Sequence, residues 1–217
     1  MNNSQKRVLI VSGGRLGSWV LDTIKPDDIL IGADRGAWFL IQQGYRPDLS
    51  VGDFDSVTEQ EKTIIQMNSS EFLSCDAILK DESDTELAFL HAMNMKPAEI
   101  VLFGALGTRF DHSLANVHLL RKAIALGIAC CIVDEFNIIH ATDRSLEVAA
   151  VEGFTHISLL PLTLEVSGVT LTGFQYPLHE ATLIMGQSLA ISNVLSATIG
   201  HVQVSTGLLL VIQSRDE

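Results

Sequence analysis

The chain has 217 residues, 47% of them hydrophobic, and 26 acidic residues against 14 basic ones give it a net charge of −12. This acidic balance argues against a surface that binds nucleic acid or an anionic membrane. It also means that a phosphate substrate would need metal ions and a local cluster of the few arginines and lysines. No apolar run is long enough to span a bilayer, and the first one is too short for a signal peptide. The three cysteines, two of them adjacent in an apolar run, are typical of a reducing compartment, so we expect a cytoplasmic protein.

The first half of the sequence alternates strand and helix patterns. Residues 7–12 form an apolar, β-rich run that meets Gly13 and Gly14, which predicts a buried strand, a tight turn and a helix near residues 16–23. Such a turn either lets the backbone approach a phosphate or is only a turn. The alternation continues with predicted strands at 29–33, 49–52, 99–103 and 128–133 and predicted helices at 36–43, 85–95 and 113–126. Two sequence patterns, at residues 58–61 and 83–86, fit a helix capping box. Alternation of this kind predicts a parallel α/β sheet.

Acidic residues follow the predicted strands. Asp34 comes directly after one strand, and Asp53 and Asp55 come after the next. Ligands of open parallel sheets bind at the carboxyl ends of the strands, and two carboxylates on one side of a strand repel each other unless a cation lies between them. Asp84, on the first turn of a predicted helix, would by itself be a partner of the helix dipole. Beside Asp53 and Asp55 it completes a predicted Mg²⁺ site of carboxylate oxygens.

The sequence pattern changes near residue 134. Short apolar or alternating runs separated by glycine, proline, asparagine and aspartate predict an all-β region, a sandwich or flattened barrel. The expected strands lie at residues 137–142, 145–151, 155–160, 164–166, 169–174, 182–185, 188–192, 198–205 and 208–213. We therefore expect an N-terminal nucleotide-binding α/β domain with a parallel sheet at residues 1–134 and a C-terminal antiparallel β-sandwich at residues 135–217.

Five stretches together resemble a known family. They are GADRGA at residues 32–37, GDFDS at 52–56, KDESDTE at 80–86, GALGTRFDHSLAN at 104–116 and SN at 192–193. Their order and spacing resemble bacterial thiamine pyrophosphokinase over almost the whole chain. The resemblance implies an α/β ATP-binding catalytic domain, a thiamine-binding β-sandwich and a homodimer. It also implies Mg²⁺-dependent transfer of the diphosphate of ATP to the hydroxyl of thiamine, which releases AMP.

The resemblance also implies roles for individual residues. Asp53, Asp55 and Asp84 are expected to bind the metal. These three residues, Arg109 and Asp111 are expected to be catalytic. Nucleotide and cofactor binding is expected of Gly13, Asp34, Arg35, Lys80, Arg109, His112 and Asn116, and thiamine binding of Ser192 and Asn193. Asp34 could bind either the metal or a group on the thiamine ring, and His112 is either a base or a structural residue at a helix start. Without the family, the Ser192–Asn193 pair would be interpreted as a turn.

Two alternatives to this function stay open. One is the same diphosphate transfer to another alcohol, such as a hydroxymethylpterin, and the other is a non-catalytic sensor of a nucleotide or vitamin. The intact acidic set argues against the sensor, because a binder needs no cluster of carboxylates bridged by metal. We also expect the active site to be shared between two chains. The predicted nucleotide edge and the thiamine segment lie in different domains, and a short connection near residues 134–137 joins them.

Overall fold

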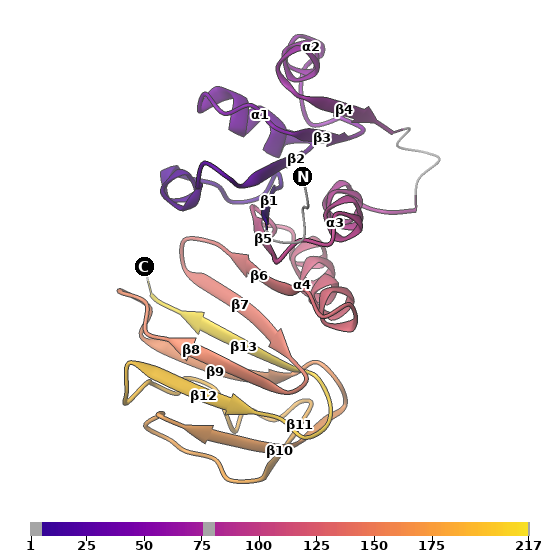
Figure 1. Ribbon diagram of the computed structural model, residues 1–217. Coiled ribbons are helices and arrows are strands. Elements are labelled where there is room, and N and C mark those ends of the chain that lie inside the picture. The colour runs from indigo at the N-terminus through magenta and orange to yellow at the C-terminus, as the bar shows by residue number, and fades with distance from the viewer. Residues whose placement is uncertain (1–5, 76–80, 217) are drawn as a thin grey trace. The chain divides into compact units, whose positions relative to one another are not determined.

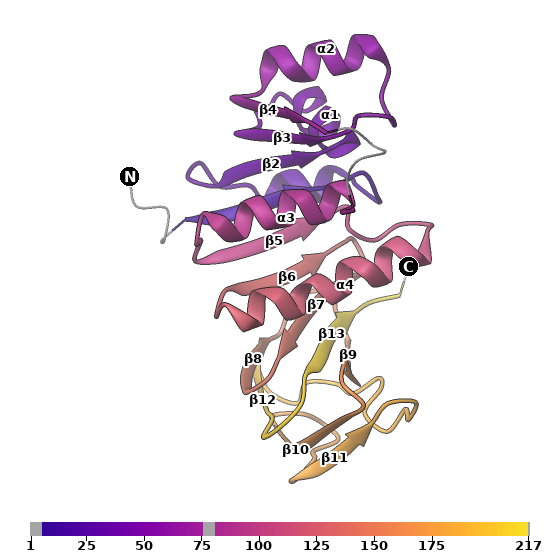
Figure 2. The same ribbon diagram turned by 90° about the vertical axis from the view of Figure 1, so that its right-hand side faces the viewer.

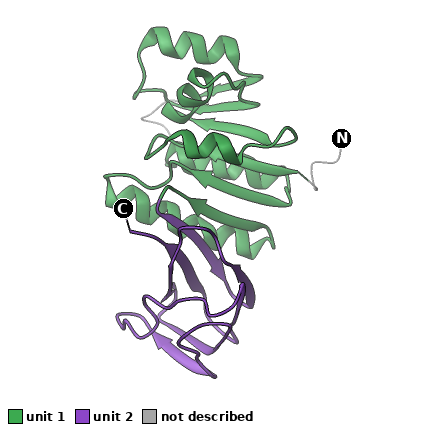
Figure 3. Cartoon of the chain, turned by 90° about the vertical axis from the view of Figure 1, so that its left-hand side faces the viewer, with its two compact units in different colours: residues 1–135 green, residues 136–217 purple. Residues whose placement is uncertain are grey.

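The computed structural model describes residues 6–75 and 81–216 of the chain. It divides into two compact units, residues 1–135 and residues 136–217 (Figure 3).

Unit 1 is a parallel sheet flanked by helices. Its elements are β1 (Arg7–Val11), η2 (Ser18–Thr23), β2 (Ile29–Ala33), α1 (Arg35–Gln42), β3 (Leu49–Gly52), α2 (Glu59–Asn68), β4 (Glu71–Ser74), α3 (Asp84–Asn94), β5 (Glu99–Phe103), α4 (Phe110–Ala125) and β6 (Ala129–Val133). The strands follow the order β4-β3-β2-β1-β5-β6, and every neighbouring pair is parallel. The chain therefore builds outward from β1 to one side and then returns to β5 on the other. In such sheets the carboxyl ends of the strands beside this switch point form the ligand-binding crevice.

Apolar side chains cover both faces of the unit 1 sheet. α1 and η2 lie against one face, and α3 and α4 lie against the other (Figures 1 and 2). On the α1 face, Leu40 and Val20 pack with Leu9 and Val11 of β1 into one buried cluster. The β1 and β2 residues are buried almost without exception, which explains why these strands show continuous apolar runs instead of alternation.

Two of the expected features of unit 1 are corrected. The predicted helix at 16–23 is a six-residue 3₁₀ helix that begins at Ser18, so Gly13 and Gly14 do not open an α-helix. The reason is that the loop after β1 is held to the loop after β5: the N–H groups of Gly14 and Arg15 donate to the carbonyls of that loop, each at 2.8 Å. Strand β4 was not predicted, because its four residues are mostly exposed and carry no apolar alternation. Both capping patterns do start helices: Thr58 forms the complete box, while the Ser83 hydroxyl accepts from the backbone N–H of the third helical residue.

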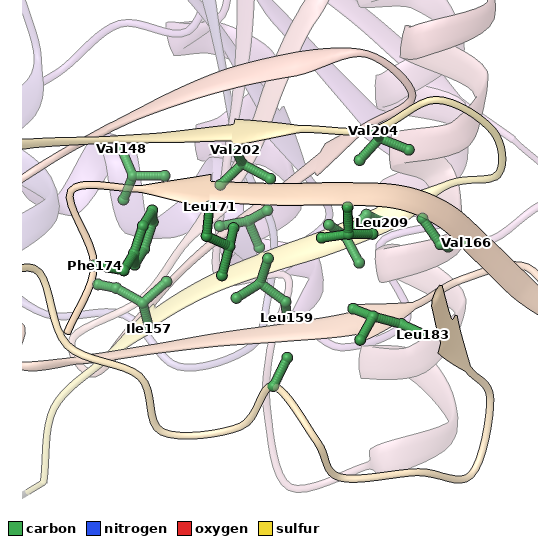
Figure 4. Packing of buried hydrophobic residues seen from close by; sticks show 13 residues of the cluster. Val148, Ile157, Leu159, Val166, Leu171, Phe174, Leu183, Val202, Val204 and Leu209 are labelled. Atoms are coloured by element: carbon green, nitrogen blue, oxygen red, sulfur yellow. The ribbon is translucent and has the colours of Figure 1, made fainter. Parts of the chain in front are cut away.

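Unit 2 is a β-sandwich. Its strands are β7 (Asn137–Thr142), β8 (Ser145–Ala149), β9 (His156–Pro161), β10 (Glu165–Thr172), β11 (Ala181–Ile184), β12 (Ile199–Gln203) and β13 (Leu209–Ser214). One antiparallel layer has the order β7-β13-β9 and the other the order β11-β10-β12-β8. Residues at two-residue spacing, such as Ile157 and Leu159 of β9, point into a core that both layers share (Figure 4). The predicted fold class, α/β followed by antiparallel β, is confirmed.

Three expected strands of unit 2 differ from the structure. The runs at 164–166 and 169–174 belong to the single strand β10, whose pairing with β11 shifts register between Val166 and Val169. Gly168 lies in this interruption with a φ of 64°, a left-handed conformation that glycine adopts without strain. The run at 188–192 is a series of turns and not a strand.

The burial of one cysteine and the hydropathy of the helices agree with what the sequence predicted. Cys131 is buried in the core of unit 1, and burial raises the pKa of its thiol to about 12. Among the described helices, none is both long and apolar enough to cross a membrane.

Candidate active site

The carboxyl ends of the unit 1 strands surround a cavity. Its volume is about 490 Å³, and it is lined by the loops that follow β1, β2, β3 and β5 and by the first turns of α3 and α4. Most of the residues that the sequence predicted for catalysis and nucleotide binding line it: Gly13, Asp34, Asp53, Asp55, Asp84, Arg109, His112 and Asn116. The strand order explains this convergence, because parallel neighbours end at the same edge of the sheet.

Three carboxylates meet on one side of this cavity. Asp34 follows β2, and Asp53 and Asp55 follow β3; one carboxylate oxygen of each lies within 4.8 Å of the other two. The backbone around them is unusual, since Asp34 has a φ of 50° and Phe54 a φ of 60°. Side chains rarely occupy this region, and such strain concentrates at functional sites. These unusual conformations occur at the ends of β2 and β3, and Phe54 separates Asp53 from Asp55 in the sequence.

Asp34 has a buried carboxylate oxygen without a hydrogen-bond partner in the described part of the chain. The Ser56 hydroxyl donates to its Oδ2, whereas its Oδ1 is buried and has no hydrogen-bond partner among the described residues. Burial raises the pKa of the Asp34 carboxyl; the negative charges of Asp84 and Asp55 add to the rise, and the Ser56 hydrogen bond opposes it. An orphaned buried oxygen beside two more carboxylates is the donor set that a hard cation such as Mg²⁺ prefers. The residues present therefore fit a divalent metal.

Asp84 lies next to this cluster and interacts with its backbone. Its Oδ1 accepts a hydrogen bond from the backbone N–H of Asp53 at 3.3 Å. A Cβ on Gly52 would lie only 3.1 Å from the Asp84 carboxyl group, so the absence of a side chain at Gly52 leaves room for α3 to approach β3. The sequence predicted Asp53, Asp55 and Asp84 as the metal set, while the tightest group in the structure is Asp34, Asp53 and Asp55. Asp84 is placed to hold the backbone of that group or to bind the cation from a further side.

Two loops close the floor of the cavity by pairing with each other. The N–H of Gly14 donates to the carbonyl of Gly104 at 2.8 Å, and the N–H of Ser12 donates to that of Phe103 at 2.8 Å. A Cβ on Gly14 would lie 2.4 Å from the Gly104 carbonyl oxygen, so only glycine fits there. Asn116, which is 7% exposed, donates from its side-chain amide to the carbonyl of Ala105 at 2.7 Å. The side-chain amide of Asn116, which the sequence analysis assigned to nucleotide binding, therefore holds the loop after β5.

Arg109 and Asp111 form a two-contact ion pair at the rim of the cavity. Arg109 Nη2 donates to Asp111 Oδ2 at 2.6 Å and Nε donates to Oδ1 at 3.3 Å. This pairing raises the pKa of Arg109 and lowers that of Asp111. Both side chains are exposed, so the guanidinium is held in a fixed orientation without being buried. Ser113 fixes the loop below, since its hydroxyl donates to the Arg109 carbonyl and accepts from the Gly107 N–H, both at 3.1 Å.

Two predicted residues of unit 1 remain to be accounted for, and two hydrogen bonds near the first cavity were not predicted. Arg35 lines a neighbouring cavity instead of the first one, and Lys80 lies outside the described residues. The Thr85 hydroxyl donates to the buried Ser12 hydroxyl at 3.0 Å and so ties α3 to the end of β1. Neither this contact nor the Ser56 hydrogen bond was predicted; Ser56 could have been found from its position in the same acidic loop.

The predicted thiamine segment lies in unit 2. Asn193 is 3% exposed, and its side chain makes three hydrogen bonds: Oδ1 accepts from the N–H groups of Tyr176 and Val194, and Nδ2 donates to the Tyr176 carbonyl at 2.7 Å. Ser192, by contrast, is exposed and has a φ of 56°, and its N–H donates to the Ser158 hydroxyl at 3.1 Å. Asn193 therefore holds two loops together, and Ser192 is the member of the pair that faces solvent.

Comparison with known proteins identifies the family. Residues 20–132 match the family described as "Thiamin pyrophosphokinase, catalytic domain", and residues 143–209 match the "Thiamin pyrophosphokinase, vitamin B1 binding domain". Thiamine pyrophosphokinase of Bacillus subtilis is 35% identical over 187 residues, which is 86% of this chain and 87% of that protein.

Solved structures agree with this match. The crystal structure of the Bacillus subtilis enzyme superposes with a TM-score of 0.88 at 32% identity and covers 97% of this chain and 100% of that one. The Geobacillus thermodenitrificans enzyme gives a TM-score of 0.87 at 32% identity, with 97% of this chain and 98% of that one covered. Both parts of the chain and its order of motifs are thus accounted for by one family, and the chain belongs to the thiamine pyrophosphokinases.

Proposed function

We propose that this protein transfers the diphosphate of ATP to the hydroxyl group of thiamine. The alcohol oxygen of thiamine forms a bond to the β-phosphorus of ATP and loses its proton, and the bond from that phosphorus to the oxygen it shares with the α-phosphorus breaks. The products are thiamine diphosphate and AMP. The observation that carries the proposal is the cluster of Asp34, Asp53 and Asp55 within 4.8 Å at the edge of the sheet. The family match favours it over transfer to a pterin alcohol and over a non-catalytic sensor.

The chemistry requires neutralisation of charge on phosphate oxygens, and unit 1 has the groups for it. We propose that Asp34, Asp53 and Asp55, with Asp84 beside them, hold Mg²⁺, which would neutralise negative charge on the phosphates. Arg109, oriented by Asp111, presents a planar fork that suits phosphate oxygens. The paired loops supply backbone that approaches the ligand closely. Catalysis on this proposal is positioning and electrostatic stabilisation rather than covalent chemistry.

The direct test is formation of AMP. Purified protein is incubated with ATP and Mg²⁺ together with thiamine, with a hydroxymethylpterin or with no acceptor. The proposal expects AMP only with thiamine, and expects its loss on chelation of the metal. AMP formed with the pterin and not with thiamine would show that the pterin is the acceptor. No AMP with either alcohol would refute the diphosphate transfer.

We also propose that the protein is a cytoplasmic homodimer whose site takes residues from two chains. The proposal rests on the family resemblance and on the assignment of catalysis and vitamin binding to different segments. Cys75, Cys130 and Cys131 are free thiols, as in a reducing compartment.

Complementation tests the shared site. A chain carrying Asp55→Asn is mixed with a chain carrying Ser192→Arg, which blocks the exposed position and leaves the supporting Asn193 in place; each variant is expected to be inactive alone. After subunit exchange, a shared site restores one good site per mixed dimer. If native mass spectrometry shows mixed dimers and no activity returns, each site belongs to a single chain.

A further inference from the structure

A second cavity adjoins the catalytic one in unit 1. Its volume is about 510 Å³, within the range of roughly 300–1,000 Å³ that is usual for small-molecule sites. The two cavities share Gly13 and Gly14 of the loop after β1. The second one has no predicted catalytic carboxylate in its lining.

One face of α1 forms a wall of this second cavity. Arg35, Trp38, Phe39 and Gln42 line it, and their spacing of three, four and seven residues places them on the same side of the helix. Glu61, from the first turn of α2, also lines this cavity. The wall therefore combines two aromatic rings with an amide, a cation and a carboxylate.

We propose that this cavity binds the adenine base and ribose of the nucleotide, and that the phosphates pass over Gly13 and Gly14 to the carboxylate cluster. The inference deepens the proposed diphosphate transfer and rests on it. It assigns to Trp38 and Gln42 a role in nucleotide binding.

The aromatic residues suit a base. Trp38 and Phe39 are each only half buried, although both pack partly against core clusters of unit 1. Their remaining surface faces the cavity that they line, and stacking on an aromatic ring is a general way to bind a purine. Gln42 is exposed, and its amide carries both donors and an acceptor. That combination matches the amino group and ring nitrogen on one edge of adenine.

The charges separate the base from the phosphates. Glu61 Oε2 accepts from the N–H of Thr58 at 2.7 Å and from its hydroxyl at 2.9 Å, and these bonds lower the pKa of the carboxyl. A fixed negative charge opposes phosphate in the second cavity. Gly13 and Gly14 line both cavities and carry no side chain, so we place the phosphates along this loop. Arg35 is exposed and lies beside Gly13, where its positive charge would attract the phosphates.

A cationic ring could also stack on Trp38 near Glu61, so thiamine is the competing occupant. Two observations favour the nucleoside. The cavity is continuous with the proposed phosphate loop through Gly13 and Gly14, and the segment that matches a vitamin B1 binding domain is residues 143–209, outside unit 1.

Tryptophan fluorescence separates the two occupants without turnover. The chain has two tryptophans, and Trp19 packs against Phe103 in the core, with ring centres 5.8 Å apart. ATP with Mg²⁺ but no thiamine, and thiamine with Mg²⁺ but no ATP, are titrated into wild type and Trp38→Phe. We expect ATP to change the emission of wild type, and the change to disappear in Trp38→Phe. A response to thiamine in place of ATP, or an ATP response that survives in Trp38→Phe, would overturn the assignment.

Kinetics provide a second readout with a matched control. Gln42→Ala removes the proposed base contact, whereas Gln43→Ala changes a neighbouring exposed glutamine that does not line the cavity. Loss of one hydrogen bond should raise the KM for ATP about fivefold in Gln42→Ala, with the KM for thiamine unchanged. Gln43→Ala should change neither constant.

The two readouts also separate this inference from the proposed reaction. An active enzyme whose KM for ATP is the same in both glutamine variants would refute the adenine site. A wild-type protein that forms no AMP would refute the transfer, while the fluorescence titration would still decide where ATP binds.

Discussion

Replacing Asp34 with asparagine should stabilise the protein when no metal is bound and remove its response to Mg²⁺. The carboxylates of Asp34, Asp53 and Asp55 lie within 4.8 Å of one another, and Asp34 Oδ1 is buried without a partner among the described residues. Asparagine keeps the acceptor that the Ser56 hydroxyl needs. It also replaces a charged oxygen with an amide that donates to the neighbouring carboxylates.

The size of the effect follows from the geometry. At the outer limit of 4.8 Å, two unit charges repel by about 1 kcal/mol in bulk water and by about 3.5 kcal/mol at an effective dielectric constant of about 20. The substitution removes the repulsion of Asp34 with both Asp53 and Asp55. Since 1 kcal/mol shifts the Tm of a domain of this size by about 2–4 °C, we expect the metal-free variant to melt several degrees above wild type.

The pH dependence has a definite sign. Burial raises the pKa of Asp34, so the metal-free fold binds this proton more tightly than the unfolded chain does. Wild type should therefore lose stability as pH rises from the ordinary aspartate pKa through the raised one. Asp34→Asn should not show this loss.

The assay is thermal unfolding in a chelator and in a Mg²⁺ series, with the exposed Asp27→Asn as the matched control. Wild type should gain about 2.7 kcal/mol at a Mg²⁺ concentration one hundred times the Kd, and Asp34→Asn should gain little and lose turnover. If Asp34→Asn melts no higher than wild type in chelator and responds equally to Mg²⁺, the three carboxylates do not share a cation.

Three further substitutions test other parts of the site. Arg109→Lys should lower kcat/KM by at least about tenfold, because lysine offers a point charge and no planar fork; a value within about threefold of wild type would show that charge alone matters. Gly14→Ala should cost about 1–3 kcal/mol of unfolding free energy, because its Cβ would lie 2.4 Å from two backbone carbonyl oxygens. The control Gly107→Ala should cost much less, because its Cβ meets only an ordinary contact at 3.5 Å. Equal melting temperatures of the two variants would contradict the tight loop pairing. Asn193→Ala should lower the stability of unit 2 by about 1–3 kcal/mol, since it removes the hydrogen bonds that this buried amide makes to the backbone of Tyr176 and Val194. Unchanged denaturant unfolding would contradict this supporting role.

Much of unit 1 was predictable because its signals are local. The buried strands are continuous apolar runs, and the acidic residues stand directly after them in the sequence. Parallel neighbours end at one edge, so Asp34, Asp53 and Asp55 could be expected there together. Strand β4 gave no such signal, because it lies at the edge of the sheet with mostly exposed residues.

Features that depend on backbone conformation or on distant partners were not predictable. Nothing in the sequence marks the left-handed conformations of Asp34 and Phe54, since neither is glycine. The sequence therefore could not show that Asp34 comes closer to Asp53 and Asp55 than Asp84 does. Thiamine binding by Asn193 stays a prediction from its motif, and the motif did not show that its amide also holds Tyr176, seventeen residues away. A motif identifies the residue, and only the fold shows which atoms are left for a ligand.

Several unfavourable features of unit 1 occur close together. Left-handed backbone at Asp34 and Phe54, mutual repulsion of three carboxylates and an unpartnered buried oxygen all occur at the ends of β2 and β3. Each of them costs free energy in the folded chain, and they persist because the buried strands and the helices packed on them fix the backbone. A divalent cation would relieve the repulsion and satisfy the oxygen together. The same arrangement that destabilises the metal-free protein therefore makes the site ready for a cation and its phosphates, so the residues that cost most stability should also matter most for turnover.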